Sequence, residues 1–409
     1  MGQNTIMKTE LVKLNLIHFF LNLFFISPVA IFFYKERGLD CFQVLMLESI
    51  LALFIFLFEV PTGIFADKFS RKKSIIAGIV IFSIETVMMI FAKGFLMFAM
   101  IFALTGIAVT FMTGSVEALI YDALKEQNQA YLMKKAMGNY GSSSLMGKFI
   151  APVIGAYIAR DLLPVQFMVL VYLTLFAIVI AFFVSLSLKD DEGSQVRSEN
   201  HSAMRLFLEG IELMRSNKFL MRIILLDIFT TPFIFEFKYL SQQNFKNSGI
   251  SITTLGFVFG LALLLSALAK KYAYRLERLL GMKRAIFLIT IVPGVCFASL
   301  AFIFNPVWLI ISFVLVRMLA EISGPLFSEY RNSHISSVNR ATAISLISMF
   351  GCFYLMFARI IIGKLANVSL GYAFIFMGMV IIGASLFLRI GEAHVRVSAG
   401  EVFLFNKGR

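Results

Sequence analysis

The chain alternates long apolar stretches with short polar segments. A helix needs about 20 mainly apolar residues to cross the hydrocarbon core of a membrane, and each stretch has about this length. The pattern therefore predicts an all-α polytopic membrane protein with twelve spanning helices. The predicted spans are 11–34, 41–62, 74–92, 95–121, 137–159, 165–188, 219–240, 251–272, 285–304, 306–329, 341–362 and 371–390.

One long polar stretch, residues 189–218, divides the spans into two sets of six. It predicts a first six-helix bundle over 1–188, a central loop over 189–218, a second bundle over 219–390 and a tail over 391–409. Asn22 and Asp227 occupy matching places in the two halves, each twelve residues before a tyrosine. Related halves of six helices are typical of transporters that bind their substrate between the halves, near the middle of the membrane.

Lysine and arginine are distributed unevenly between alternate loops. With the N-terminus inside, the inner segments carry 27 of these residues and the outer loops carry 7. Because cytoplasmic loops are enriched in lysine and arginine, both termini, the central loop and the tail are predicted to be cytoplasmic. The inner loops also account for the net charge of +13, so no nucleic-acid partner is expected.

The composition narrows the class of protein further. Of the 409 residues, 59% are hydrophobic and 15% are charged, whereas a soluble domain is about half apolar and about a quarter charged. This excludes a soluble enzyme, a disordered chain and a disulfide-stapled secreted domain. No acid–base or metal-binding motif of a membrane enzyme is apparent, and nothing resembles a channel filter. We therefore expect no enzymatic activity, no metal site and no cofactor.

The segment EVPTGIFADKFSRKK, residues 59–73, covers the end of span two and the following turn. It resembles the signature turn of the major facilitator superfamily, Gly-x3-Asp-(Arg/Lys)-x-Gly-Arg-(Arg/Lys). Ser70 replaces the second glycine. The matching residues are Gly63, Asp67, Lys68, Arg71 and Lys72.

This resemblance implies the major facilitator fold and a turn that acts as a conformational latch. Gly63 would let span two approach a neighbouring helix closely. Asp67 would favour the start of span three and face the start of span eleven, while Arg71 would pair with Asp122 at the inner end of span four. The latch would hold the two halves together on the cytoplasmic side. The alternative is that the basic residues of the turn, including Lys72, only set the topology.

Span five contains the sequence GKFIAPVIGA at residues 147–156. It resembles the antiporter motif of proton-coupled drug exporters, Gly-x3-Gly-Pro-x2-Gly-Gly. Gly147, Pro152 and Gly155 match, and alanine stands at the two other glycine positions. Pro152 would kink the helix and the small residues would let it pack tightly. This resemblance favours export over import.

The spacing Glu59-x-Pro61-x5-Asp67 resembles the variant turn of clostridial-type tetracycline efflux proteins, which makes tetracycline the leading substrate. In that family the drug can travel as a chelate, so a divalent cation is expected only as part of the substrate. Glu59, with Pro61 beside it, would line the gate or cap the substrate path. The alternative is a carboxylate at a helix end that reaches towards water.

Ionisable side chains inside the spans are candidates for function, because each costs about 2.5–3.5 kcal/mol at the middle of the membrane. Asp227 has no obvious local partner, and a carboxylate in apolar surroundings binds protons readily. The resemblance places Glu117 and Lys148 beside the central cavity. Asp227 and Glu117 are therefore the predicted proton-coupling groups.

Other intramembrane charges receive weaker assignments. Arg317 and Glu321 are four residues apart on one helix, so they are expected to pair, either as structural neutralisation or as part of the coupling. With Lys148 and Glu236 they form the predicted charged lining of the substrate cavity. Glu85 receives no role, because span three usually faces lipid in this superfamily.

Asn15, His18 and Asn22 are spaced three and four residues apart in span one, so they share one helix face. The first span of each half lines the cavity in the superfamily, which favours substrate contact by these residues. The alternative is hydrogen bonding to neighbouring helices.

Together these features predict a monomeric, multi-pass exporter of the bacterial cytoplasmic membrane. It would exchange an amphipathic drug, with tetracycline as the first choice, for protons. The alternatives are a multidrug exporter or a metabolite importer built on the same fold.

Overall fold

A computed structural model of the protein describes residues 2–125, 128–189, 218–334 and 340–390, and these are almost entirely helical. The predicted tail over 391–409, and all but the ends of the predicted central loop, lie outside the described residues. By their contacts the residues form two compact units, one of residues 1–198 with 251–260 and the other of residues 199–250 with 261–409.

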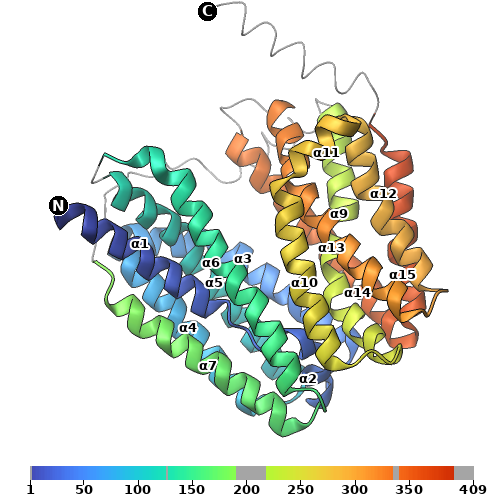
Figure 1. The fold of residues 1–409 in the computed structure, drawn as a ribbon, viewed down its shortest axis with the longest axis horizontal. Coiled ribbons are helices and arrows are strands. Elements are labelled where there is room, and N and C mark those ends of the chain that lie inside the picture. Colours follow the sequence, from blue (N-terminus) through green and yellow to red (C-terminus); the bar gives the residue numbers. More distant parts are fainter. Residues whose placement is uncertain (1, 126–127, 190–217, 335–339, 391–409) are drawn as a thin grey trace, which may run out of the picture. The chain divides into compact units, whose positions relative to one another are not determined.

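The helices α1 to α7 belong to the first unit (Figure 1). Short 3-10 turns precede α2 and α6, at Ser27–Val29 and Ala130–Leu132. The helices are α1 (Gly2–Leu21), α2 (Ala30–Glu36), α3 (Cys41–Phe69), α4 (Arg71–Phe91), α5 (Gly94–Lys125), α6 (Met133–Ile158) and α7 (Pro164–Leu186).

The remaining helices carry the second half of the sequence (Figure 1). They are α9 (Lys218–Asn247), α10 (Ile252–Lys271), α11 (Ala273–Leu280), α12 (Met282–Leu300), α13 (Pro306–His334), α14 (Arg340–Val368) and α15 (Leu370–Phe387). Among the described residues, nine helices are long and apolar enough to cross a membrane by themselves. The other three crossings are α1 with α2, α6 and α9, so the predicted twelve-span, all-α fold is confirmed.

The first predicted span is not one continuous helix, which corrects the prediction of a helix over 11–34. Helix α1 ends at Leu21, and the chain resumes helical structure only at Ser27. Pro28 explains part of this break, because proline lacks a backbone N–H and is favoured in the first turn of a helix, here the 3-10 turn Ser27–Val29. The backbone N–H of Phe25, inside the break, donates to the Thr174 hydroxyl of α7 at 3.2 Å. Non-helical backbone at membrane depth needs such protein partners.

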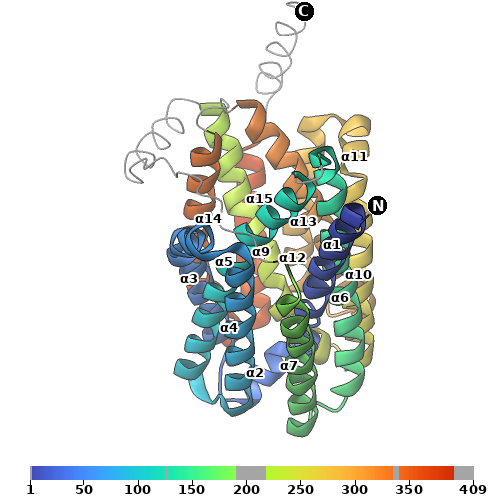
Figure 2. The same ribbon diagram turned by 90° about the vertical axis from the view of Figure 1, so that its left-hand side faces the viewer.

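Helices α4 and α5 lie side by side in the first unit (Figure 2). The Ser74 hydroxyl of α4 donates to the Phe111 carbonyl at 2.8 Å, and the Ser115 hydroxyl donates to Ser74 at 2.8 Å. A Cβ at Gly78 would lie 3.0 Å from the Ala108 carbonyl oxygen. Small residues and hydroxyls therefore bring these two helices together, as is usual inside membranes.

Large aromatic side chains fill the outer part of the core in each unit. In the first unit the ring of Phe33 packs against Phe98 and Phe167, with centroids 5.9 Å apart in both pairs. In the second unit Phe237 packs edge-on against Phe297, with centroids 4.9 Å apart. Edge-to-face packing of this kind stabilises a core beyond the burial of apolar area.

Candidate functional site

The first unit contains a cavity of about 500 Å³ between α1, α4, α5 and α6. Drug-sized ligands occupy pockets of about 300–1,000 Å³, so this cavity has the size for one small organic molecule. Most of its wall is apolar, and polar groups from three helices reach it. Its lining residues are His18, Leu21, Asn22, Phe82, Val109, Met112, Thr113, Val116, Glu117, Met137 and Tyr140.

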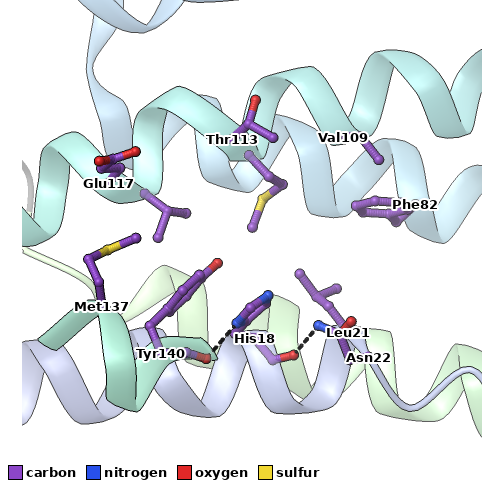
Figure 3. A pocket seen from close by; sticks show the side chains of 11 residues that line it. His18, Leu21, Asn22, Phe82, Val109, Thr113, Glu117, Met137 and Tyr140 are labelled. Carbon is purple, nitrogen blue, oxygen red and sulfur yellow. Dashed lines mark hydrogen bonds between the residues drawn. The ribbon is translucent and has the colours of Figure 1, made fainter. Parts of the chain in front are cut away.

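One wall of the cavity is a flat pair of rings from two helices. The His18 ring of α1 stacks on the Tyr140 ring of α6, with centroids 3.7 Å apart and planes 6° apart. His18 Nδ1 lies 2.9 Å from the Tyr140 carbonyl oxygen, and the Asn22 amide donates to the His18 carbonyl at 2.7 Å (Figure 3). These contacts hold the imidazole in one orientation against the phenol.

The opposite wall is built by α5, which presents Thr113 and Glu117 across the cavity from Tyr140 and His18 (Figure 3). Glu117 is exposed to the cavity space. A carboxylate on one side and a stacked ring pair on the other suit a molecule with a flat apolar body and a polar or cationic group.

The structure brings some predicted cavity residues together and leaves others apart. His18, Asn22 and Glu117 line the cavity, whereas Asn15 on the same face of α1 does not. Lys148 does not line the cavity, although it interacts electrostatically with His18. Tyr140 was not predicted to line the cavity, because a tyrosine near the inner end of a polar span gives no sign of which helix it will face.

The antiporter-like segment of α6 packs directly on the interrupted first span. A Cβ at Gly147 would lie 2.7 Å from the Phe19 carbonyl oxygen, and a Cβ at Gly155 would collide with the Phe25 carbonyl oxygen. Pro152 is buried inside α6. The small residues of this segment therefore permit α6 to lie against non-helical backbone, next to the cavity.

At the inner end of the unit, the turn between α3 and α4 forms an ion pair within the unit. The Arg71 guanidinium of α4 contacts the Asp122 carboxylate of α5. Its function as a latch between the halves stays a prediction. Lys72 is half-buried beside it.

The structure gives two local observations on this turn. No described residue of its own unit lies within 4 Å of a Cβ built at Gly63. Helix α4 is capped by Ser70, whose hydroxyl accepts from the Lys73 amide at 3.3 Å, and Asp67 lies two residues before the end of α3. The expected close approach at Gly63 and the expected role of Asp67 stay predictions. Glu59 and Pro61 are exposed on α3, and no gate contact is described for them.

Ser70 has φ 154° and ψ 148°, a conformation that glycine adopts far more easily than other residues. This geometry gives a physical reason for glycine at this place in the signature turn. The serine side chain offsets part of the strain through its capping hydrogen bond.

In the second unit, α9 carries two carboxylates with different partners. The Thr231 hydroxyl donates to Asp227 Oδ1 at 2.7 Å, so the expectation of a carboxylate without a local partner is wrong. Glu236 Oε1 accepts from Arg359 of α14, at 3.0 Å from Nε and 2.7 Å from Nη2. Both side chains of this pair are buried, and the partners are too far apart in sequence for spacing to reveal them.

The expected interaction of Arg317 with Glu321 is electrostatic rather than a direct ion pair, since the charge of Glu321 acts on Arg317. The direct ion pair of Glu321 is with α10, where Glu321 Oε2 accepts from Lys270 Nζ at 3.1 Å. The Arg317 guanidinium lies over the Phe235 ring, 5.9 Å from its centroid. An aromatic face stabilises a guanidinium inside the membrane.

The profile of the family described as "Major Facilitator Superfamily" matches residues 14–352. The chain belongs to the Major Facilitator Superfamily. It is therefore a multi-pass membrane transporter, as the twelve spans and the signature turn predicted. Within the superfamily it is 23% identical over 345 residues to an uncharacterised MFS-type transporter, YxaM of Bacillus subtilis (strain 168), covering 82% of this chain and 84% of that one.

Solved structures of other transporters share the fold. The crystal structure of the nucleoside transporter NupG aligns with a TM-score of 0.75 and 15% identity, over 94% of this chain and 97% of that one. A POT family transporter in complex with a thioalcohol-conjugated peptide aligns with a TM-score of 0.71 and 12% identity, over 92% and 95% of the two chains. These similarities show that the chain has the same fold and leave the substrate open.

Proposed function

We propose that the protein exports an amphipathic organic molecule across the cytoplasmic membrane in exchange for protons, with tetracycline as the first substrate to test. The observation that carries the proposal is the cavity of about 500 Å³ in the first unit, with its stacked His18–Tyr140 wall and its single carboxylate. The antiporter-like packing of α6 beside that cavity supports exchange of substrate against protons.

Glu117 is the group in this cavity that carries the exchange. A carboxylate in an apolar cavity is stabilised either by a proton or by a cationic group of the substrate, because an uncompensated charge there is costly. Binding of a proton and binding of the cationic group of the substrate are then mutually exclusive at Glu117. Asp227, held by Thr231, is a second coupling candidate in the second unit.

The test is uptake of tetracycline by everted membrane vesicles that contain the protein, with and without a protonophore. Everted vesicles expose the inner face, so an exporter accumulates drug inside them. We expect uptake that collapses when the proton gradient is removed. Absence of uptake despite good expression would exclude tetracycline and call for a wider substrate screen.

Glu117→Gln is the matched variant for this assay. Loss of a charge-assisted contact costs about 1.5–3 kcal/mol, which corresponds to about a tenfold or larger loss of affinity. We therefore expect substrate binding to weaken and to lose its dependence on pH. The surface variant Asp161→Asn, in the turn before α7, serves as the control and is expected to transport normally.

A second candidate is uptake of a metabolite with a planar ring, such as a nucleoside. The flat His18–Tyr140 wall suits any planar ring, and NupG, which shares the fold, is a nucleoside transporter. Right-side-out vesicles that accumulate labelled uridine, together with everted vesicles that take up no tetracycline, would favour this candidate.

A further inference from the structure

Glu85 lies inside α4, six residues before that helix ends at Phe91, and its side chain is only 7% exposed. The function proposed above does not use it. Span three was expected to face lipid, yet this carboxylate is turned into the first unit, where burial of a charged group is strongly unfavourable. Such a group needs a cation, a proton or several hydrogen bonds.

The surroundings of Glu85 supply hydroxyl groups and no cation among the described residues. The Thr86 hydroxyl donates to the Phe82 carbonyl at 2.7 Å and also lies 3.4 Å from Glu85 Oε1. The Thr105 hydroxyl of α5 donates to the Ile101 carbonyl at 2.9 Å and lies within reach of the same carboxyl group. Helix α7, which also packs against α4, has no charged residue.

The cations nearest in the fold are occupied elsewhere. Arg37 Nε lies 3.0 Å from Glu36 Oε2, and Arg37 Nη1 donates to the Ala92 carbonyl at 3.3 Å. Lys35 interacts with the Cys41 thiol. Lys93 is exposed in the turn after α4. None of the three forms a described ion pair with Glu85.

Two other titratable groups lie near Glu85. The charges of Glu48 on α3 and of Glu85 both act on the phenol of Tyr34 on α2. Glu48 is half-buried, whereas Tyr34 is fully enclosed among Phe33, Phe98 and Phe102. Neither group is a cation, so neither one compensates a negative charge on Glu85.

We propose that Glu85, with Thr86 and Thr105, is a proton-binding site of the first unit. The proton comes from water and returns to water, so no other reactant is needed. In its neutral form Glu85 fits an environment of hydroxyls and apolar side chains without a cation. This site is distinct from Glu117, which faces the cavity, and does not depend on the identity of the substrate.

Infrared difference spectroscopy of the full chain in lipid nanodiscs tests the proposal without any substrate. A protonated carboxyl group has a C=O stretching band that an ionised carboxylate lacks. We expect the wild type to show such a band at neutral pH and to lose it reversibly at alkaline pH. The band should be absent in Glu85→Gln, shifted in Glu85→Asp, and unchanged in the surface control Asp161→Asn.

A band that persists in Glu85→Gln, or a wild type without one at neutral pH, would overturn the site. Glu85→Asp keeps the acid, so the site stays testable if Glu85→Gln folds poorly.

Discussion

Gly155 is the residue at which backbone packing is tightest in the first unit. A Cβ at this position would collide with the Phe25 carbonyl oxygen, and neither α6 nor the interrupted first span can move without disturbing the cavity between them. Glycine is needed here because no side chain fits beside the Phe25 carbonyl. The backbone conformation does not require it, since Gly155 lies in a regular helix.

We therefore expect Gly155→Ala to destabilise the protein by about 3 kcal/mol, at the upper end of typical overpacking costs. Thermal unfolding in detergent, followed by size-exclusion chromatography, measures this change. Gly141→Ala in the same helix is the matched control, because nothing lies within 4 Å of a Cβ there. Equal melting temperatures for the two variants would contradict the packing described.

Ser70 provides a prediction of the opposite sign. Its positive φ costs about 1–3 kcal/mol for a residue other than glycine, whereas replacing a serine cap by glycine costs only a few tenths of a kcal/mol. Ser70→Gly should therefore raise stability by about 1 kcal/mol, measured by the same thermal assay. Ser70→Ala keeps the strain and loses the cap, so it should lower stability, and a gain in that variant would refute the account.

At the scale of helices, α9 and α14 are joined by the buried pair of Glu236 and Arg359. Arg359 is 6% exposed and Glu236 is 3% exposed, so each charge compensates the other inside the core. Removal of one partner takes this compensation away, whereas removal of both leaves neutral groups.

Glu236→Gln or Arg359→Gln alone should thus lower the free energy of unfolding by about 3–5 kcal/mol. The double variant should recover a large part of this loss. A double-mutant cycle on thermal stability gives the coupling energy directly. If the losses of the two single variants simply add in the double variant, the coupling energy of Glu236 and Arg359 is zero and the account is contradicted.

The helices could be predicted from the sequence much better than their interruptions and partners. Hydrophobic stretches mark the twelve spans because lipid excludes unsatisfied backbone polar groups. The break after Leu21 carries no comparable signal, since Leu23 to Ile26 are as apolar as a spanning helix and only Pro28 marks its end. The direct ion-pair partner of Glu321 was not predicted for a related reason: helical spacing reveals neighbours on one helix, but not a lysine on α10.

At the scale of the whole molecule, we expect the signature turn to be needed for transport but not for insertion of the protein into the membrane. Asp67 is exposed and has no described packing role, so Asp67→Asn should leave the fold intact. We expect this variant to insert into the membrane normally and to lose transport, measured as vesicle uptake per molecule of fluorescently tagged protein. Lys73→Gln, outside the signature, is the control, and full activity of Asp67→Asn would discard the latch.

The candidate cavity could be predicted only in part, and the reason lies in how it is assembled. His18 and Asn22 were found because they share the face of one helix. Phe82 and Met137 come from other helices, and tertiary packing alone decides that their side chains meet α1. The chemistry of the substrate can therefore be inferred only from the assembled cavity. The resemblance to the superfamily, in contrast, can be recognised in one short turn of the sequence.

The hydrogen bond from the Phe25 amide to Thr174 also sets an order of events during synthesis. Thr174 belongs to the sixth span, and it is translated 149 residues after the amide that it satisfies. Until α7 has entered the membrane, the interrupted part of the first span lacks this partner. The interrupted span is thus completed only after half of the spans have been made, and a nascent chain that stops before α7 leaves the Phe25 amide without its Thr174 partner.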